Sequence, residues 1–176
     1  MKLKSVFSLI LTIVNFNLNT QKNPLNQPAP LFTAQAVFPD GSVRHFDLAD
    51  YIGQNIVLYF YPKDNTPGCT IQAKKFRDGI EKLNKAGIMV IGVSCDSIKS
   101  HLKFQKKHAL PYPLVSDSRW KRSISKAYGA AGFLYSQRKT FLINQDGIVF
   151  QLFDHVDIHN QIDDILHSFT SQKTTK

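Results

Sequence analysis

The most constraining feature of the sequence is an apolar run that ends at a proline and is followed by a short polar loop and a helical pattern. Residues 55–61 form a run that is apolar at every position after the first, without alternation. Such a run is typical of a strand buried on both faces. Pro62 ends this run. Thr66-Pro67 then has the signals of a helix start, because threonine is a good N-cap and proline is favoured at the first helical position. The pattern predicts strand, loop and helix, with Cys69 in the first helical turn.

A cysteine in this position has a distinct chemical setting. Unpaired backbone N–H groups and the positive end of the helix dipole converge on the first turn, and both favour an anion there. We therefore expect Cys69 to be held as a thiolate, the reactive form of the side chain, and to be accessible to a small oxidant. The alternative is that Cys69 is a small buried hydrophobe, since free cysteine packs well in cores.

The rest of the chain alternates between strand and helix patterns. We expect strands at residues 32–38, 43–46, 56–61, 88–93, 114–115, 139–144 and 148–153. A helical turn is expected at 48–52 and helices at 67–86, 97–108, 119–128 and 158–169. Turn residues join the first two and the last two strands, which predicts two hairpins. In helix 97–108 the residues expected to face inward are Ile98, Leu102, Phe104 and Gln105. This order predicts an α/β fold with a mixed sheet.

The length of 176 residues predicts a single domain with flanking segments. Residues 1–20 are basic and then apolar, which indicates a signal peptide or other leader and hence periplasmic or other export. A cytoplasmic enzyme with an untranslocated extension is the alternative. Residues 21–30 are expected to be a linker, 31–170 the domain and 171–176 a flexible tail.

The charge and the cysteine count exclude several classes of function. The net charge is +9, but the basic residues are spread out, so we expect a solvated surface, with no nucleic acid and no stable membrane partner. The two cysteines, 69 and 95, form neither a C-x-x-C pair nor a zinc pattern. We therefore expect no metal and no cofactor.

Three residues of the strand–loop–helix segment carry a family resemblance. Pro62, Thr66 and Cys69 fit the P-x-x-x-T-x-x-C signature of peroxiredoxins. The string YFYPKDNTPGCT resembles the bacterioferritin comigratory protein branch of that family, whose members are thioredoxin-dependent thiol peroxidases. The resemblance extends over residues 24–169 and implies a thioredoxin-like fold with an N-terminal β-hairpin. It implies that Cys69 is the peroxidatic nucleophile, that Thr66 hydrogen-bonds the thiolate and the peroxide, and that Pro62 shields the thiolate from water.

The same resemblance implies an active-site arginine just before the strand at 139–144. Arg138 occupies that position, but the adjacent Lys139 stands where the family has Ser or Thr, so the sequence leaves open which basic residue turns inward. Many relatives have Glu at the position of Gln72. A neutral Gln72 can still hydrogen-bond the arginine but forms no ion pair.

The second thiol departs from the family pattern. Two-cysteine members often carry a resolving cysteine five residues after the first, where this chain has Lys74. Cys95 follows a buried strand, so it borders the crevice at the strand ends and is a possible resolving or second thiol. A disulfide requires Cα atoms within about 7 Å, which the sequence does not establish. We interpret the chain as a one-cysteine enzyme.

The function that follows is reduction of hydrogen peroxide and organic hydroperoxides through a sulfenic acid on Cys69. The resemblance implies recycling by a thioredoxin-like protein or a low-molecular-weight thiol. We also expect a monomer. Two alternatives remain open at this point. One is a thiol–disulfide oxidoreductase of the thioredoxin fold, against which the missing C-x-x-C counts. The other is a non-enzymatic basic binding module.

Overall fold

The computed structural model describes residues 23–117 and 119–174 of the chain. Within them, seven strands form one sheet in the order β2-β1-β5-β4-β3-β6-β7. The strands are β1 (Thr33–Val37), β2 (Val43–Asp47), β3 (Asn55–Phe60), β4 (Ile88–Ser94), β5 (Leu114–Ser116), β6 (Lys139–Ile143) and β7 (Val149–Phe153). The helices are the short 3-10 helix η1 (Leu48–Tyr51), α1 (Pro67–Lys85), α2 (Ile98–His108), α3 (Ser123–Ala127) and α4 (Gln161–Thr174).

The pairing of the strands confirms the predicted α/β architecture. Strand β3 runs parallel to β4 and β4 runs parallel to β5, whereas β6 is antiparallel to β3. The pairs β1–β2 and β6–β7 are antiparallel, so both predicted hairpins are present. The sheet is therefore mixed, with the parallel strands β3 and β4 near its centre.

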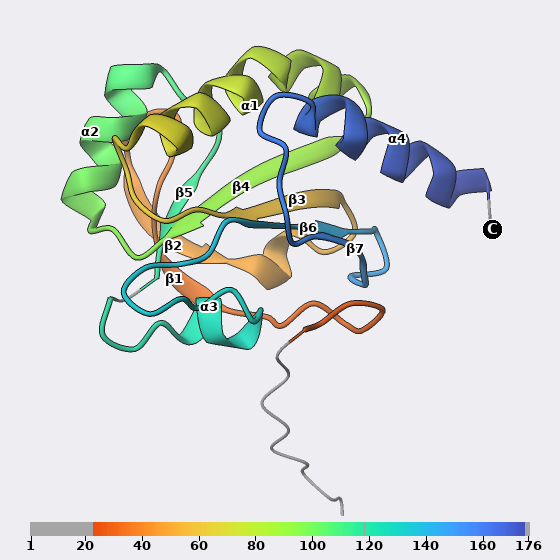
Figure 1. Ribbon diagram of the computed structural model, residues 1–176, viewed down its shortest axis with the longest axis horizontal. Coiled ribbons are helices and arrows are strands. Elements are labelled where there is room, and N and C mark those ends of the chain that lie inside the picture. Colours follow the sequence, from red (N-terminus) through yellow and green to blue (C-terminus); the bar gives the residue numbers. More distant parts are fainter. Residues whose placement is uncertain (1–22, 118, 175–176) are drawn as a thin grey trace, which may run out of the picture.

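Two layers of helices enclose the sheet. Helices α1, α2 and α4 cover one face, and α3 and η1 lie against the other (Figure 1). All six residues of β3 are buried, as the lack of alternation predicted. Tyr59 of β3 faces the first layer, where it stacks on Phe76 of α1 at a ring distance of 4.6 Å. Phe60 faces the second layer and lies 5.4 Å from the ring of Tyr128.

Helix α3 is shorter than the helix predicted at 119–128, and the reason is local. Arg122 has a φ of 47°, which is outside the helical region and stops the helix from starting earlier. The sequence offers Ser118, which lies outside the described residues, or Asp117 as the N-cap of the helix predicted at 119–128. Asp117 acts as a cap of the shorter helix from across the intervening turn, because its carboxylate accepts hydrogen bonds from the backbone N–H groups of Ile124 and Ser125 at 3.3 and 2.8 Å.

Helix α4 is shifted relative to the prediction of 158–169. Asp157 holds residues 158–160, which precede the helix, in a turn. Its carboxylate accepts hydrogen bonds from the backbone N–H of His159 at 2.9 Å and from the side chain of Asn160 at 2.8 Å. The helix therefore begins at Gln161, and it continues to Thr174. The part of the predicted flexible tail that the structure describes is thus helical.

The buried face of α2 was predicted correctly for two of its four expected residues. Ile98 and Leu102 are only partly buried, whereas His101, Phe104, Gln105 and His108 are buried. Phe104 and Gln105 were expected inside; the two histidines were not. His101 and Gln105 find partners on other elements: Gln105, for example, donates to the backbone oxygen atoms of Val37 and Tyr112. The buried Nε2 atom of His108 has no hydrogen-bond partner among the described residues.

The predicted linker packs on the body of the domain. Residues 24–30 form no helix, as expected, and the N–H of Ala29 donates to the carbonyl of Gly147 at 2.8 Å, in the turn between β6 and β7. The predicted leader, residues 1–20, lies outside the described residues. Within residues 23–117 and 119–174, no helix has the length and apolar character needed to cross a membrane.

Candidate active site

Three strand ends meet at one edge of the sheet. Phe60, the last residue of β3, pairs with Val93 of β4 on one side and with Lys139, the first residue of β6, on the other. The loop after β3, the end of β4 and the residue before β6 therefore emerge together. This register brings the 62–66 loop, Cys95 and Arg138 to the same edge, although they are far apart in the sequence.

Cys69 lies in the first turn of α1, as predicted. Thr66 is the N-cap, Pro67 is the first helical residue, and the first helical backbone bond runs from the N–H of Thr70 to the carbonyl of Thr66 at 2.9 Å. The amides of Gly68 and Cys69 precede that bond and belong to the unpaired N–H groups of a helix start. The backbone environment is therefore one that stabilises an anion.

The sulfur is less accessible than the sequence analysis expected. The side chain of Cys69 is only 2% exposed and belongs to the apolar cluster that includes Tyr61, Ala73 and Phe76. The first turn of α1 faces the sheet, which turns the thiol inward. The expectation that Cys69 is exposed to a small oxidant is therefore wrong for this conformation.

Arg138 supplies the positive charge at the sulfur. Its Nη2 atom lies 3.4 Å from Cys69 Sγ, and its Nη1 atom donates to Gln72 Oε1, one helical turn further along α1. A cation in contact with the sulfur favours the thiolate over the thiol. Gly68 allows this approach, because a Cβ atom at that position would lie 3.3 Å from Nη2. The guanidinium thus bridges the thiol and the helix that carries it.

A pair of buried amides holds Arg138 in place. Gln72 is fully buried, and its Nε2 donates to Oε1 of Gln161 at 3.1 Å. Gln161 in turn donates to the backbone oxygen of Gln72 at 3.3 Å. The hydrogen bond between Gln72 and Arg138 was anticipated from the sequence, but Gln161 was missed. It lies 89 residues from Gln72 at the start of α4, and no local pattern marks it.

The neighbouring lysine has a different role. Lys139 Nζ lies 2.7 Å from Asp154 Oδ1, and this contact is the main reason that the pKa of Asp154 is lowered. The open question of which basic residue turns inward is thereby answered. Successive residues at the start of β6 point in opposite directions, so Arg138 reaches Cys69 and Lys139 reaches β7 and the residues after it.

The loop before α1 holds the two other expected site residues. Pro62 is partly buried at its start. Thr66 is also partly buried, and its hydroxyl donates to the carbonyl of Lys63 at 2.9 Å. The expected hydrogen bond from Thr66 to the thiolate is therefore not made in this conformation. The lone pairs of the Thr66 oxygen stay available to accept a hydrogen bond from an O–H group.

Cys95 follows β4 at the same sheet edge but has a separate environment. It is 8% exposed, and its Sγ lies 3.4 Å from Ser136 Oγ, which is linked through Ser125 to Asp117. It also lines a cleft with Lys63 and Arg119. Cys69 and Cys95 are both free thiols. Among the described residues, no cluster of three or more His, Cys, Asp or Glu side chains is suited to hold a metal ion.

The chain is similar in sequence to known proteins. Residues 25–151 match the model of the AhpC/TSA family. Peroxiredoxin bcp of Coxiella burnetii is 36% identical over 150 residues, which are 81% of this chain and 95% of that protein. Peroxiredoxin Q, chloroplastic, of Oryza sativa subsp. japonica is 40% identical over 130 residues, which are 72% of this chain but only 57% of that protein.

Solved structures show the same fold. A structure of the Xanthomonas campestris bacterioferritin comigratory protein, described in relation to alkyl peroxide reduction, has a TM-score of 0.72 and 30% identity over 80% of this chain and 91% of that one. The architecture predicted from the sequence, a thioredoxin-like fold with an N-terminal hairpin, is confirmed.

Proposed function

The chain belongs to the AhpC/TSA family, and we propose that Cys69 is the nucleophile of its thiol peroxidase reaction. It is a peroxiredoxin similar to the bacterioferritin comigratory protein and peroxiredoxin Q. The observation that carries the assignment of Cys69 is the contact of 3.4 Å between its sulfur and Arg138 Nη2 at the start of α1. Arg138, Thr66 and Pro62 are proposed to complete the site.

The chemistry is a two-electron displacement. The thiolate sulfur of Cys69 attacks the terminal oxygen of hydrogen peroxide or an organic hydroperoxide, and the O–O bond breaks. The sulfur is oxidised to sulfenic acid, while the departing oxygen takes a proton and leaves as water or an alcohol. Arg138 stabilises the negative charge as it moves from sulfur to oxygen, and the Thr66 oxygen accepts the O–H of the bound peroxide.

The reductant is proposed to be a thiol from outside the chain, either a thioredoxin-like protein or a low-molecular-weight thiol. One thiol condenses with the sulfenic acid of Cys69, releasing water and forming a mixed disulfide, and a second thiol restores the Cys69 thiol. The separate environment of Cys95 supports this one-cysteine cycle. That the enzyme acts as a monomer is a further proposal.

Export of the enzyme is a further proposal, supported by the basic and then apolar sequence of residues 1–20. Cell fractionation with antibody detection tests it, since an exported enzyme is recovered outside the cytoplasm and shortened at its N-terminus. Recovery of full-length protein in the cytoplasmic fraction alone would contradict it.

Two measurements test the assignment of Cys69. Cys69→Ser is expected to abolish peroxide consumption and to keep the parent circular dichroism spectrum; consumption at the parent rate would show that the assignment is wrong. Intact mass after one equivalent of peroxide distinguishes the cycles. A gain of about 16 Da on Cys69 indicates a sulfenic acid. A loss of about 2 Da indicates a disulfide with Cys95.

A further inference from the structure

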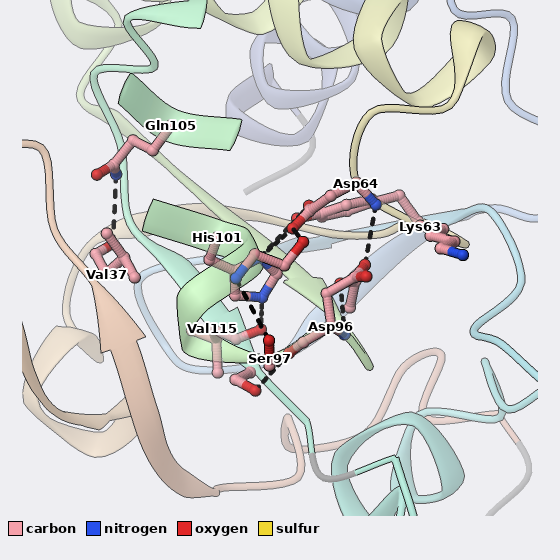
Figure 2. Close-up of polar contacts among 12 residues, drawn as sticks. Val37, Lys63, Asp64, Asp96, Ser97, His101, Gln105 and Val115 are labelled. Carbon is pink, nitrogen blue, oxygen red and sulfur yellow. Dashed lines mark hydrogen bonds and ion pairs between the residues drawn. The ribbon is translucent and has the colours of Figure 1, made fainter. Parts of the chain in front are cut away.

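The loop that precedes α1 is anchored by one buried carboxylate. Of loop residues 63–65, Lys63 and Asn65 are exposed, whereas Asp64 is only 5% exposed. Figure 2 shows its side chain directed into the protein towards α2, with Lys63 directed away. The next residue, Asn65, has a φ of 59°, so the backbone turns sharply between Asp64 and Thr66. The position of the loop therefore depends on Asp64.

Three side chains donate hydrogen bonds to the Asp64 carboxylate. Tyr61 Oη donates to Oδ1 at 2.8 Å, while Ser100 Oγ at 2.7 Å and His101 Nδ1 at 2.9 Å share Oδ2. Burial is the main reason that the pKa of Tyr61 is raised, with the Asp64 charge second, so Tyr61 remains a neutral donor. Each oxygen atom of the Asp64 carboxylate thus accepts at least one hydrogen bond.

His101 is held by contacts at both of its ring nitrogens. The ring is fully buried, and its Nε2 lies 3.3 Å from the carbonyl oxygen of Val115, on β5 (Figure 2). The two ring nitrogens thus lie against the Asp64 carboxylate and the backbone of β5. His101 therefore connects the loop to α2 and to the sheet through buried hydrogen-bond contacts.

The backbone of the loop is held as well. The N–H of Asp64 donates to Asp96 Oδ2 at 2.9 Å, just after β4, and that oxygen also accepts from Ser94 at 2.8 Å. On the other side, the carbonyl of Lys63 accepts from the Thr66 hydroxyl. A continuous set of contacts therefore runs from His101 through Asp64 to Thr66, which is the residue proposed to bind the peroxide.

We propose that Asp64, fixed by His101, is a positioning residue for peroxide reduction, acting through the loop that places Pro62 and Thr66 beside Cys69. The proposal rests on the function proposed above. The sulfur must meet the O–O bond in line, and a displacement of about 1 Å in groups that orient a substrate costs about 100-fold in rate. The alternative is that the contact between Asp64 and His101 only stabilises the fold.

Two reactions of Cys69 separate these roles. Oxidation by hydrogen peroxide needs the oriented loop, whereas alkylation by iodoacetamide needs only the thiolate and access to it. Both second-order rate constants are measured on the full chain, with the product assigned to Cys69 by peptide mass. Asp64→Asn is expected to lower the peroxide rate constant by about 10- to 100-fold. Its alkylation rate constant is expected to stay the same or to rise, because a looser loop opens the way to the sulfur.

A matched pair at His101 sharpens the test. His101→Asn keeps an N–H donor near the position of Nδ1 and is expected to retain a ratio of peroxide to alkylation rates within about threefold of the parent. His101→Phe removes the donor and is expected to lower that ratio about as far as Asp64→Asn does. The proposal is overturned if the two rates fall in parallel, if the ratio is unchanged in folded Asp64→Asn, or if both His101 variants behave alike.

A milder change keeps the test decisive if these variants do not fold. Ser100→Ala removes one of the three donors to Asp64 and is expected to lower the ratio by about threefold to tenfold; an unchanged ratio overturns the proposal. Failure of the positioning proposal can be distinguished from failure of the proposed function. Loss of the positioning role leaves peroxide consumption dependent on Cys69, whereas loss of the function leaves it unaffected by Cys69→Ser.

Discussion

Replacing Arg138 with alanine is expected to slow the attack of Cys69 on hydrogen peroxide by about 100- to 1000-fold. The guanidinium nitrogen lies 3.4 Å from the sulfur. Two unit charges at that distance attract each other by about 5 kcal/mol at an effective dielectric constant of about 20. Water that fills the vacated space recovers part of this energy. Removing one donor from a developing anion costs about 2.7–4 kcal/mol, which corresponds to the stated loss of rate.

The assay is quench-flow oxidation under excess peroxide, with the sulfenic acid on Cys69 trapped and quantified by intact mass. Lys139→Ala is the matched control, because it removes an adjacent cation whose partner, Asp154, is 53% exposed. The Lys139 side chain is 14% exposed, but its charge is paired with Asp154 and not directed at Cys69, so this variant is expected to react within about threefold of the parent. The reasoning is refuted if Arg138→Ala reacts within that range, or if the two variants lose activity equally.

Three further changes test the packing and the protonation behaviour of the fold. Gly79→Val is expected to lower the unfolding free energy by about 2 kcal/mol in guanidinium titrations, because a Cβ there would lie 2.9 Å from Ile162 Cγ1 in α4; an unchanged midpoint would contradict this contact. Tyr112→Phe removes a hydrogen bond to the backbone oxygen of Ala73 at 3.0 Å and is expected to cost about 1–2 kcal/mol, measured in the same way. Burial, and then nearby lysine and arginine charges, lower the pKa of His108 below 6.5, so the unfolded chain binds more protons just below pH 6.5. Stability should rise with pH through that window and level off above it, and His108→Gln should flatten the rise; an identical pH profile in the variant would be evidence against it.

The strand–loop–helix segment was predictable because its signals are local. The apolar run of β3, the proline after it and the Thr66-Pro67 helix start are contiguous in the sequence, and each has a steric or hydrogen-bonding cause. The hairpins were predictable for the same reason. The position of Arg138 followed from family resemblance, and the choice between Arg138 and Lys139 required the register of β6, which a single sequence does not contain.

The features that were missed depend on partners distant in the sequence. An apolar pattern suggested that Ile98 and Leu102 face inward from α2, but His101 occupies the interior because Asp64, 37 residues earlier, supplies its partner. Gln161 meets Gln72 across 89 residues. The accessibility of Cys69 was also misjudged, since the helix start indicates the electrostatics of the first turn but not which way the turn faces.

The hydrogen-bond partners of Arg138 determine how much of its positive charge acts on the sulfur of Cys69. A carboxylate at position 72 would orient the guanidinium but would also neutralise part of its charge. Here Gln72 orients it through a neutral amide, which Gln161 fixes in turn, and within residues 23–117 and 119–174 Arg138 forms no ion pair with a carboxylate. The positive charge is therefore directed at Cys69 without a competing anion. Cys69 is 2% exposed, so water contributes little to solvating negative charge on its sulfur during the proposed attack. The undivided charge of Arg138 and the unpaired N–H groups of the first turn of α1 are the groups that face that charge.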